Sequence, residues 1–199
     1  MATRKKSGPH PDLNSPLVID VSRLGRRPGS MMTIDQTVPS PRRIGLDLIA
    51  IEPDAEMDLD LRFEAVSEGV LVTGTVYAPT RGECSRCLGP ITGEVDIALT
   101  ELFAYPDSIT ESTTDAEEIG RVIDQTVDLA QPIIDAVGLA LPFVPVCVED
   151  CPGLCPQCGV ALATAEAGHH HDLIDPRWAK LAEMRPADPG GTEPDGTRS

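Results

Sequence analysis

The chain has 199 residues, 41% of them hydrophobic but only 3% aromatic, and its formal net charge at pH 7 is −16. This length allows one domain with a hydrophobic core and terminal tails, and no apolar run approaches the roughly 20 residues that a membrane-spanning helix needs. The basic first residues are not followed by an apolar segment, so we expect no secretory signal, a cytoplasmic protein and reduced cysteines.

The charge is unevenly distributed along the chain. Residues 1–43 carry 8 Lys/Arg and 3 Asp/Glu, a net charge of +5, whereas residues 44–150 carry 4 and 22, a net charge of −18. A body this acidic repels phosphate, so it is a poor surface for wrapping RNA or DNA, and it suits a basic protein partner. The basic N-terminal arm could still contact nucleic acid, and so could a small local patch.

The first 30 residues combine a polar arm, a short strand and a basic loop. Residues 1–15 are polar and contain two prolines, which predicts a disordered arm. Residues 16–21 predict a strand, and a turn-rich loop follows it. The arginines of this loop are either solvated or the contact point for RNA or for the acidic body, and we take them as candidate partner contacts: Arg23, Arg26 and Arg27.

Alternating apolar and polar residues then predict an antiparallel sheet. From Met57 to Glu64 apolar and charged residues alternate without a break, which is the pattern of a strand with one buried and one solvated face. A turn at residues 67–69 joins this strand to a β-branched segment, so the two form a hairpin. The sheet has about six predicted strands, at 16–21, 31–38, 45–51, 57–64, 70–77 and 91–100.

The pattern becomes helical after the sheet. Residues 106–120 are acidic and rich in Ser and Thr, and we expect a flexible loop there. Apolar residues three and four positions apart predict one main amphipathic helix from Val127 to Leu141, with Pro132 tolerated in its first turn. Asp175 and Pro176 are start signals for a short C-terminal helix.

These elements predict an α+β fold: an antiparallel sheet of about six strands, one main helix, a cysteine-rich zinc knuckle and a short C-terminal helix. Residues 16–184 would form a single zinc-binding domain. The Pro- and Gly-rich residues 185–199 would form a disordered tail.

The six cysteines carry the chemistry. Cys84 and Cys87 form one C-x-x-C pair between two predicted strands, and Cys155 and Cys158 form another in a Cys-Pro-Gln-Cys-Gly turn. In such a turn Pro and Gly bend the backbone so that two thiolates point at one ion. Two C-x-x-C pairs on a short chain are typical of a zinc site, so we expect one or two Zn²⁺ ions.

Two arrangements of the ligands are open. In the first, Cys84, Cys87, Cys147 and Cys151 hold one ion, and a second ion is held by Cys155, Cys158, His169 and His171. In the second, the two C-x-x-C pairs form one zinc ribbon, which leaves Cys147 and Cys151 as spare thiols. Those two thiols could then act as a redox sensor.

No catalytic motif is evident. The chain has no nucleophile elbow, no phosphate-binding glycine loop and no H-E-x-x-H, and the candidate ligands leave no open coordination position. We therefore expect a protein that is not an enzyme and has no small-molecule substrate.

Four segments together resemble the YceD family, and the segments Leu24–Ser30 and Gly168–His171 resemble its high-GC Gram-positive form. The four segments are Gly82-Glu83-Cys84-Ser85-Arg86-Cys87-Leu88, Leu139-Ala140-Leu141-Pro142-Phe143-Val144-Pro145, the block from Cys147 to Gly159, and Asp175-Pro176-Arg177-Trp178. The resemblance implies a role in the accumulation of 23S ribosomal RNA. Some members have a Cys-x-Cys pair near the position of the histidines, which implies a second site made by Cys155, Cys158 and two histidines.

The resemblance and the charge together predict a bacterial, zinc-stabilised protein that supports assembly of the large ribosomal subunit. Its partners would be a basic ribosomal protein, ribosomal RNA, or both, and it would have no membrane partner. The alternatives are direct RNA binding through the zinc knuckles and the redox sensor.

Overall fold

The computed structural model describes residues 12–106, 108–114 and 119–171, and these residues form nine strands and two helices. Most of the strand pairs are antiparallel, which agrees with the predicted α+β class. The arm up to residue 11, the predicted C-terminal helix and the tail at 185–199 lie outside the described residues. Residues 12–15 form a turn, in which the Ser15 amide donates to the Asp12 carbonyl at 2.8 Å.

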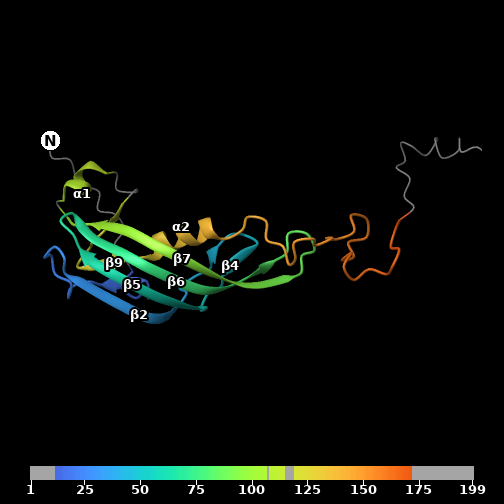
Figure 1. The fold of residues 1–199 in the computed structure, drawn as a ribbon, viewed down its shortest axis with the longest axis horizontal. Helices are drawn as coiled ribbons and strands as arrows, with labels where there is room; N and C mark the ends of the chain where they lie inside the picture. The colour runs from blue at the N-terminus through green and yellow to red at the C-terminus, as the bar shows by residue number, and fades with distance from the viewer. Residues whose placement is uncertain (1–11, 107, 115–118, 172–199) are drawn as a thin grey trace, which may run out of the picture.

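One long antiparallel sheet is the frame of the molecule (Figure 1). Its centre is β6 (Gly69–Glu83), which pairs with β5 (Glu56–Ala65) on one side and with β7 (Pro90–Ala104) on the other. Beyond β5 lies β2 (Met31–Pro39). Short strands complete the structure: β3 (Ile44–Gly45) and β4 (Ile49–Ile51) beside the end of β6, β8 (Gly120–Arg121) parallel to β7, and a separate pair of β1 (Val18–Asp20) and β9 (Thr126–Asp128).

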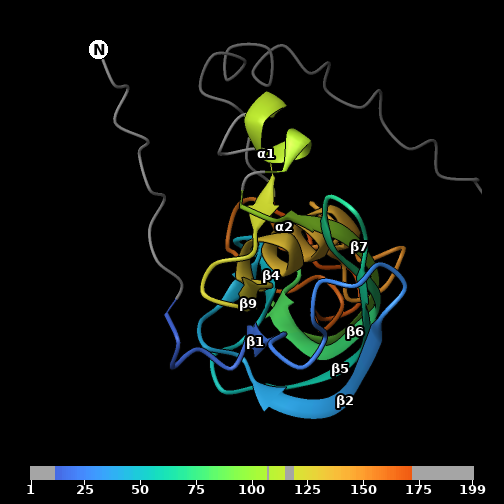
Figure 2. The same cartoon turned by 90° about the vertical axis from the view of Figure 1, so that its left-hand side faces the viewer.

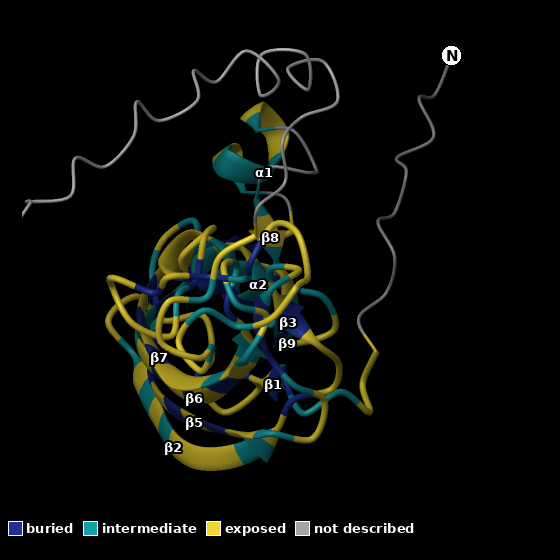
Figure 3. Ribbon diagram, turned by 90° about the vertical axis from the view of Figure 1, so that its right-hand side faces the viewer, coloured by how far each residue is buried: buried dark blue, intermediate teal, exposed yellow. Residues whose placement is uncertain are grey.

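The sheet curls around helix α2 (Ala130–Ala140), as Figure 2 shows. The alternation predicted for β5 is present, since Leu59, Leu61 and Phe63 are buried while Asp58 and Asp60 are exposed (Figure 3). Ile133 and Val137 supply the buried stripe of α2 and belong to the same core. Because β-strand side chains alternate between faces, one face of the sheet holds the core and the other faces solvent.

Three local predictions were wrong. Residues 45–51 form the hairpin β3–β4 and not one strand, with the Leu46 amide donating to the Ile49 carbonyl at 2.9 Å. Residues 126–128 form β9 and not the first turn of the helix, because they pair with β1. The segment expected to be a flexible loop contains α1 (Ile109–Thr113), which begins where Ser108 accepts a hydrogen bond from the Glu111 amide. The strand count of six was therefore too low.

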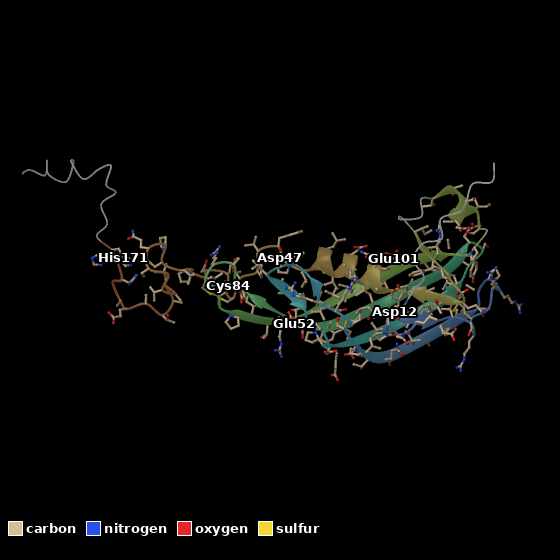
Figure 4. All side chains as sticks on the ribbon, turned by 180° about the vertical axis from the view of Figure 1, so that it is seen from behind. Asp12, Asp47, Glu52, Cys84, Glu101 and His171 are labelled. Carbon is tan, nitrogen blue, oxygen red and sulfur yellow. The ribbon has the colours of Figure 1, made fainter. Side chains whose placement is uncertain are left out.

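The β6–β7 ladder gives the molecule two distinct ends. Each strand has 15 residues, so the ladder spans roughly 45 Å. At one end Glu83 pairs with Pro90, next to the first cysteine pair, and the cysteine-rich segment extends outward from there (Figure 4). At the other end Gly69 pairs with Ala104, close to α1. Neither described helix is long and apolar enough to cross a membrane.

Candidate metal centres

The sulfur atoms of Cys84, Cys87, Cys147 and Cys151 form one group, which we call site 1. The Cys84 and Cys151 sulfurs are 3.7 Å apart, and those of Cys87 and Cys147 are 3.8 Å apart. A tetrahedral metal with bonds of about 2.3 Å separates its sulfur ligands by about 3.8 Å, whereas a disulfide would bring two sulfurs to about 2.05 Å. The spacing therefore fits a single metal ion held by four thiolates.

The backbone of the β6–β7 turn positions the first two ligands of site 1. The Cys84 amide donates to the Gly89 carbonyl at 2.8 Å, and the Leu88 amide donates to the Cys84 carbonyl at 2.9 Å. Leu88 has a φ of 57°, so the turn closes through a left-handed residue. Both cysteines are thus mounted on the end of a rigid two-stranded ladder.

Arg86, between those two cysteines, ties the second half of site 1 to the turn. Its guanidinium donates to the Cys151 carbonyl at 3.1 Å, and its own carbonyl accepts from the Leu154 amide at 3.2 Å. Gly153 has a φ of 78°, and a Cβ there would lie 3.1 Å from the Arg86 carbonyl oxygen. Arg86 therefore cross-links two segments that are distant in the sequence.

Amide donors and neighbouring sulfurs set the thiol pKa values at site 1. The amide of Cys87, which donates to the Cys84 sulfur, lowers the pKa of Cys84 to about 6. The hydrogen bond with Cys151 raises the pKa of Cys147 to about 12. Four thiolates repel one another strongly at this spacing, so a bound cation would remove the conflict between them.

Cys155, Cys158, His169 and His171 form a second group, site 2, farther from the sheet (Figure 4). The Cys158 sulfur lies 3.4 Å from His169 Nε2 and 3.3 Å from His171 Nε2, and the two nitrogens are 3.1 Å apart. A tetrahedral ion predicts about 3.6 Å and 3.3 Å for such sulfur–nitrogen and nitrogen–nitrogen pairs. This group could also hold one metal ion.

A short turn and a tight bend create site 2. The Gly159 amide donates to the Cys155 carbonyl at 2.9 Å, and the amide of Cys158 is the largest cause that lowers the pKa of Cys155 to about 6. His170 lies close to the carbonyl of Gly168, with its Nδ1 at 2.7 Å from that oxygen, and it is not among the four ligand positions. Cys158 and His171 are exposed, whereas Cys84 and Cys151 of site 1 are buried.

The structure thus places all eight predicted ligands in the two groups of the first arrangement. It does not bring the two C-x-x-C pairs together as a single ribbon would require. The sulfurs of Cys147 and Cys151 lie beside those of the first pair.

The predicted contact loop lies at the opposite end of the molecule from the cysteines. Arg23, Arg26 and Arg27 are all exposed. The guanidinium carbon of Arg26 is 4.8 Å from the centre of the Tyr105 ring. Sequence reasoning missed Tyr105, because a single tyrosine just after a strand carries no pattern that marks it.

Comparisons with known proteins agree with the resemblance in the sequence. The family model described as "Large ribosomal RNA subunit accumulation protein YceD" matches residues 72–185. An uncharacterized protein of Mycobacterium tuberculosis is 69% identical over 170 residues, which cover 85% of this chain and 82% of the relative. An uncharacterized protein of Mycobacterium leprae is 55% identical over 188 residues, covering 94% and 86%. No solved structure matches.

Proposed function

Since the chain belongs to the YceD family of large ribosomal RNA subunit accumulation proteins, we propose that it supports 23S ribosomal RNA accumulation and large-subunit assembly as a zinc-stabilised, non-enzymatic protein. It would act in the cytoplasm by holding a basic ribosomal protein, with its arginine loop in contact with RNA. The functional unit would be one domain, residues 16–184.

Zinc is the metal that the donor sets favour. Site 1 offers four thiolates and site 2 two thiolates and two imidazoles, and soft sulfur ligands in a tetrahedron select zinc among the common cellular divalent ions. Four protein ligands fill a tetrahedral zinc and leave no open position for substrate, which supports a structural role. Zinc at site 1 would fasten the segment after α2 to the end of the sheet.

The observation that carries the partner proposal is the outer face of the sheet, opposite α2. The register places Asp35 opposite Asp60, and Tyr77 lies between Asp58 and Asp96. Like charges directly opposite each other are destabilising unless something offsets them. We call this surface the acidic face, and its exposed carboxylates are Asp35, Glu56, Asp58, Asp60, Glu94 and Asp96.

Few cations offset the acidic face. Arg62 lies within it, but its guanidinium is 3.0 Å from the Glu64 carboxylate. A polypeptide rich in Lys and Arg would neutralise the remaining carboxylates, and complementary charge both steers and selects such a partner. Ribosomal proteins are basic because they bind RNA, so the acidic face fits one of them in its RNA-free state.

Placing Cys147 and Cys151 at site 1 argues against the redox-sensor alternative, which needs these two as free thiols. Their sulfurs stand in one group with those of Cys84 and Cys87. If they are metal ligands, all four sulfurs of the group hold one ion. If they are sensor thiols, Cys84 and Cys87 have only two of the four ligands that a tetrahedral ion needs.

The test is affinity purification of the tagged protein from its own cells after brief crosslinking. Recovery of a basic large-subunit protein or of precursor 23S RNA supports the proposal, and recovery of neither contradicts it. A matched variant with Asp35, Asp58 and Asp60 changed to Asn should keep the fold and lose the basic protein.

A further inference from the structure

A cavity of about 400 Å³ lies at the end of the sheet away from the cysteines. Four separate segments line it: the arginine loop with Gly25 and Arg26, the start of β6 with Val70, the residues just after β7 with Tyr105, and the turn between β8 and β9 with Asp124 and Gln125. Its volume is within the range of small-ligand sites, which are typically about 300–1,000 Å³. Neither metal centre uses this cavity.

Tyr105 and Arg26 form a stacked pair in the cavity wall. The Tyr105 side chain is only 8% exposed, and the Arg26 guanidinium carbon sits 4.8 Å from its ring centre. Burial raises the pKa of Tyr105, so the ring remains a neutral phenol at pH 7. The ring therefore holds the guanidinium by a cation–π contact, and Arg26 itself stays exposed.

The loop that supplies Arg26 is a local exception to the acidic surface. Residues 21–30 contain three arginines and no carboxylate. Among the ion pairs of the described residues, none involves Arg23, Arg26 or Arg27. Asp20 directly precedes this loop and Asp124 lies in the cavity wall, so the positive charge is confined to the loop itself, on a chain that otherwise repels phosphate.

Two residues in the opposite wall of the cavity, Asp124 and Gln125, have an unfavourable backbone conformation. Asp124 and Gln125 have φ values of 49° and 62°, and they form the two-residue turn that joins Ile123 to Thr126. A turn with two left-handed residues prefers Asn-Gly. The Gln125 carbonyl accepts from the Val21 amide at 2.8 Å, which ties this turn to the arginine loop. Such strained residues are concentrated at ligand sites.

We propose that this cavity binds one unpaired nucleotide, with its base stacked on the Arg26 guanidinium and its phosphates attracted by Arg23 and Arg27. The inference deepens the proposed RNA contact and rests on it. Proteins read unpaired bases by stacking them on aromatic rings or on guanidinium planes. Asp124 and Gln125 supply polar groups at the edge of the same cavity, and Tyr105 acts as the positioning residue.

The test is fluorescence anisotropy with a labelled single-stranded RNA decamer at low salt, the same sequence as a duplex, and unlabelled GMP or UMP as competitors. We expect binding of the single strand and not of the duplex. Competition by a mononucleotide identifies a free nucleotide as a sufficient ligand, and its absence identifies the RNA chain as the ligand.

Variants separate stacking from charge. Arg26→Ala and Arg26→Lys should both weaken single-strand binding about tenfold, because a base that stacks on an aromatic ring gains about five- to hundredfold and a guanidinium plane serves as a stacking surface in the same way. Tyr105→Phe should bind like the wild type, and Tyr105→Leu should bind weakly while its circular dichroism stays unchanged. Arg62→Ala, which removes an equal charge from the acidic face, is the control and should leave binding intact.

Several results overturn the inference: no binding at low salt, equal binding of duplex, full binding by Arg26→Lys, or equal loss in Arg62→Ala. Its failure can be told from failure of the proposed function by affinity purification of the wild-type protein from cells beside the anisotropy assay. If wild-type protein recovers a basic ribosomal protein yet binds no single strand in vitro, only the nucleotide cavity is wrong.

Discussion

Cys84 and Cys151 are 67 positions apart in the sequence, and their sulfur atoms lie 3.7 Å apart at the end of the sheet. Cys84 is held by the β6–β7 turn, and Cys151 belongs to the segment that follows α2. A metal at this point would close a loop that includes β7, α1, β8, β9 and the whole of α2.

Each group of ligands should hold one zinc. Native mass spectrometry of protein purified without chelator should show two ions in the wild type and one in either Cys84→Ser or Cys158→Ser, because each variant removes one ligand from one site. His170→Ala is the matched control, since His170 lies between the two histidine ligands but outside the group, and it should retain two. Finding one ion in the wild type would contradict the prediction that each group of ligands holds its own zinc.

Site 2 should lose its metal before site 1. Two of its ligands, Cys158 and His171, are exposed and one is buried, whereas site 1 has two buried ligands and one exposed one, so a chelator reaches site 2 more easily. A chromogenic chelator should therefore report two release phases, and Cys158→Ser should lack the fast one. Release in a single phase from the wild type would argue against this order.

Gly153→Ala should destabilise site 1. A left-handed φ costs a non-glycine residue about 1–2 kcal/mol, and the new Cβ would also lie 3.1 Å from the Arg86 carbonyl oxygen. Gly25→Ala is the control, because Gly25 has a φ of 66° and no atom within 4 Å of its added Cβ. Gly153→Ala should lower the melting temperature more than the control and should speed zinc release. Equal effects would show that the contact with Arg86 has no role.

The metal-free, reduced protein should become more stable as the pH rises from about 6 to 9. Folding lowers the pKa of Cys84 and of Cys155 from 9.0 to about 6. A group with a lowered pKa stabilises the fold fully above its unfolded-state pKa, and this stabilisation is lost as the pH falls to its folded-state pKa. The pKa of Cys147, raised to about 12, opposes this trend only above pH 9.

Urea midpoints in the presence of a chelator and a reductant measure this dependence. The wild type should show a midpoint that rises from pH 6 to 9, and Cys155→Ser should show a smaller rise. A flat wild-type profile would mean that the amide donors at Cys84 and Cys155 do not stabilise thiolates.

Asp60→Lys should separate stability from partner binding. It places a lysine opposite Asp35, and a cross-strand pair of opposite charges contributes about 0.2–1 kcal/mol. The melting temperature should therefore rise slightly, while recovery of the basic ribosomal protein falls. Arg62→Asp, which adds to the acidic face, should have the opposite effect on recovery. Unchanged recovery in both variants would exclude this face as the docking surface.

Local patterns were enough to predict that the long strands and the main helix exist, but β6 continues to Glu83, beyond the predicted 70–77, and α2 begins at Ala130 and not at Val127. The unbroken alternation from Met57 to Glu64 indicated β5, and the spacing of Ile133 and Val137 indicated the buried side of α2. The strands β8 and β9 were not predicted, because with two and three residues they are too short to have a periodicity and exist through pairing with β7 and β1.

The sequence by itself determined which residues could be metal ligands, because a C-x-x-C spacing orients two thiolates through local turn geometry alone. It left open which pairs of ligands share an ion, since that depends on where the chain lies after it has passed through β7 and α2. The tertiary structure decided that Cys147 and Cys151 meet the first pair, and that His169 and His171 meet the second. It also brought Arg26 over Tyr105, 79 positions later, a contact made by folding and not by any local pattern.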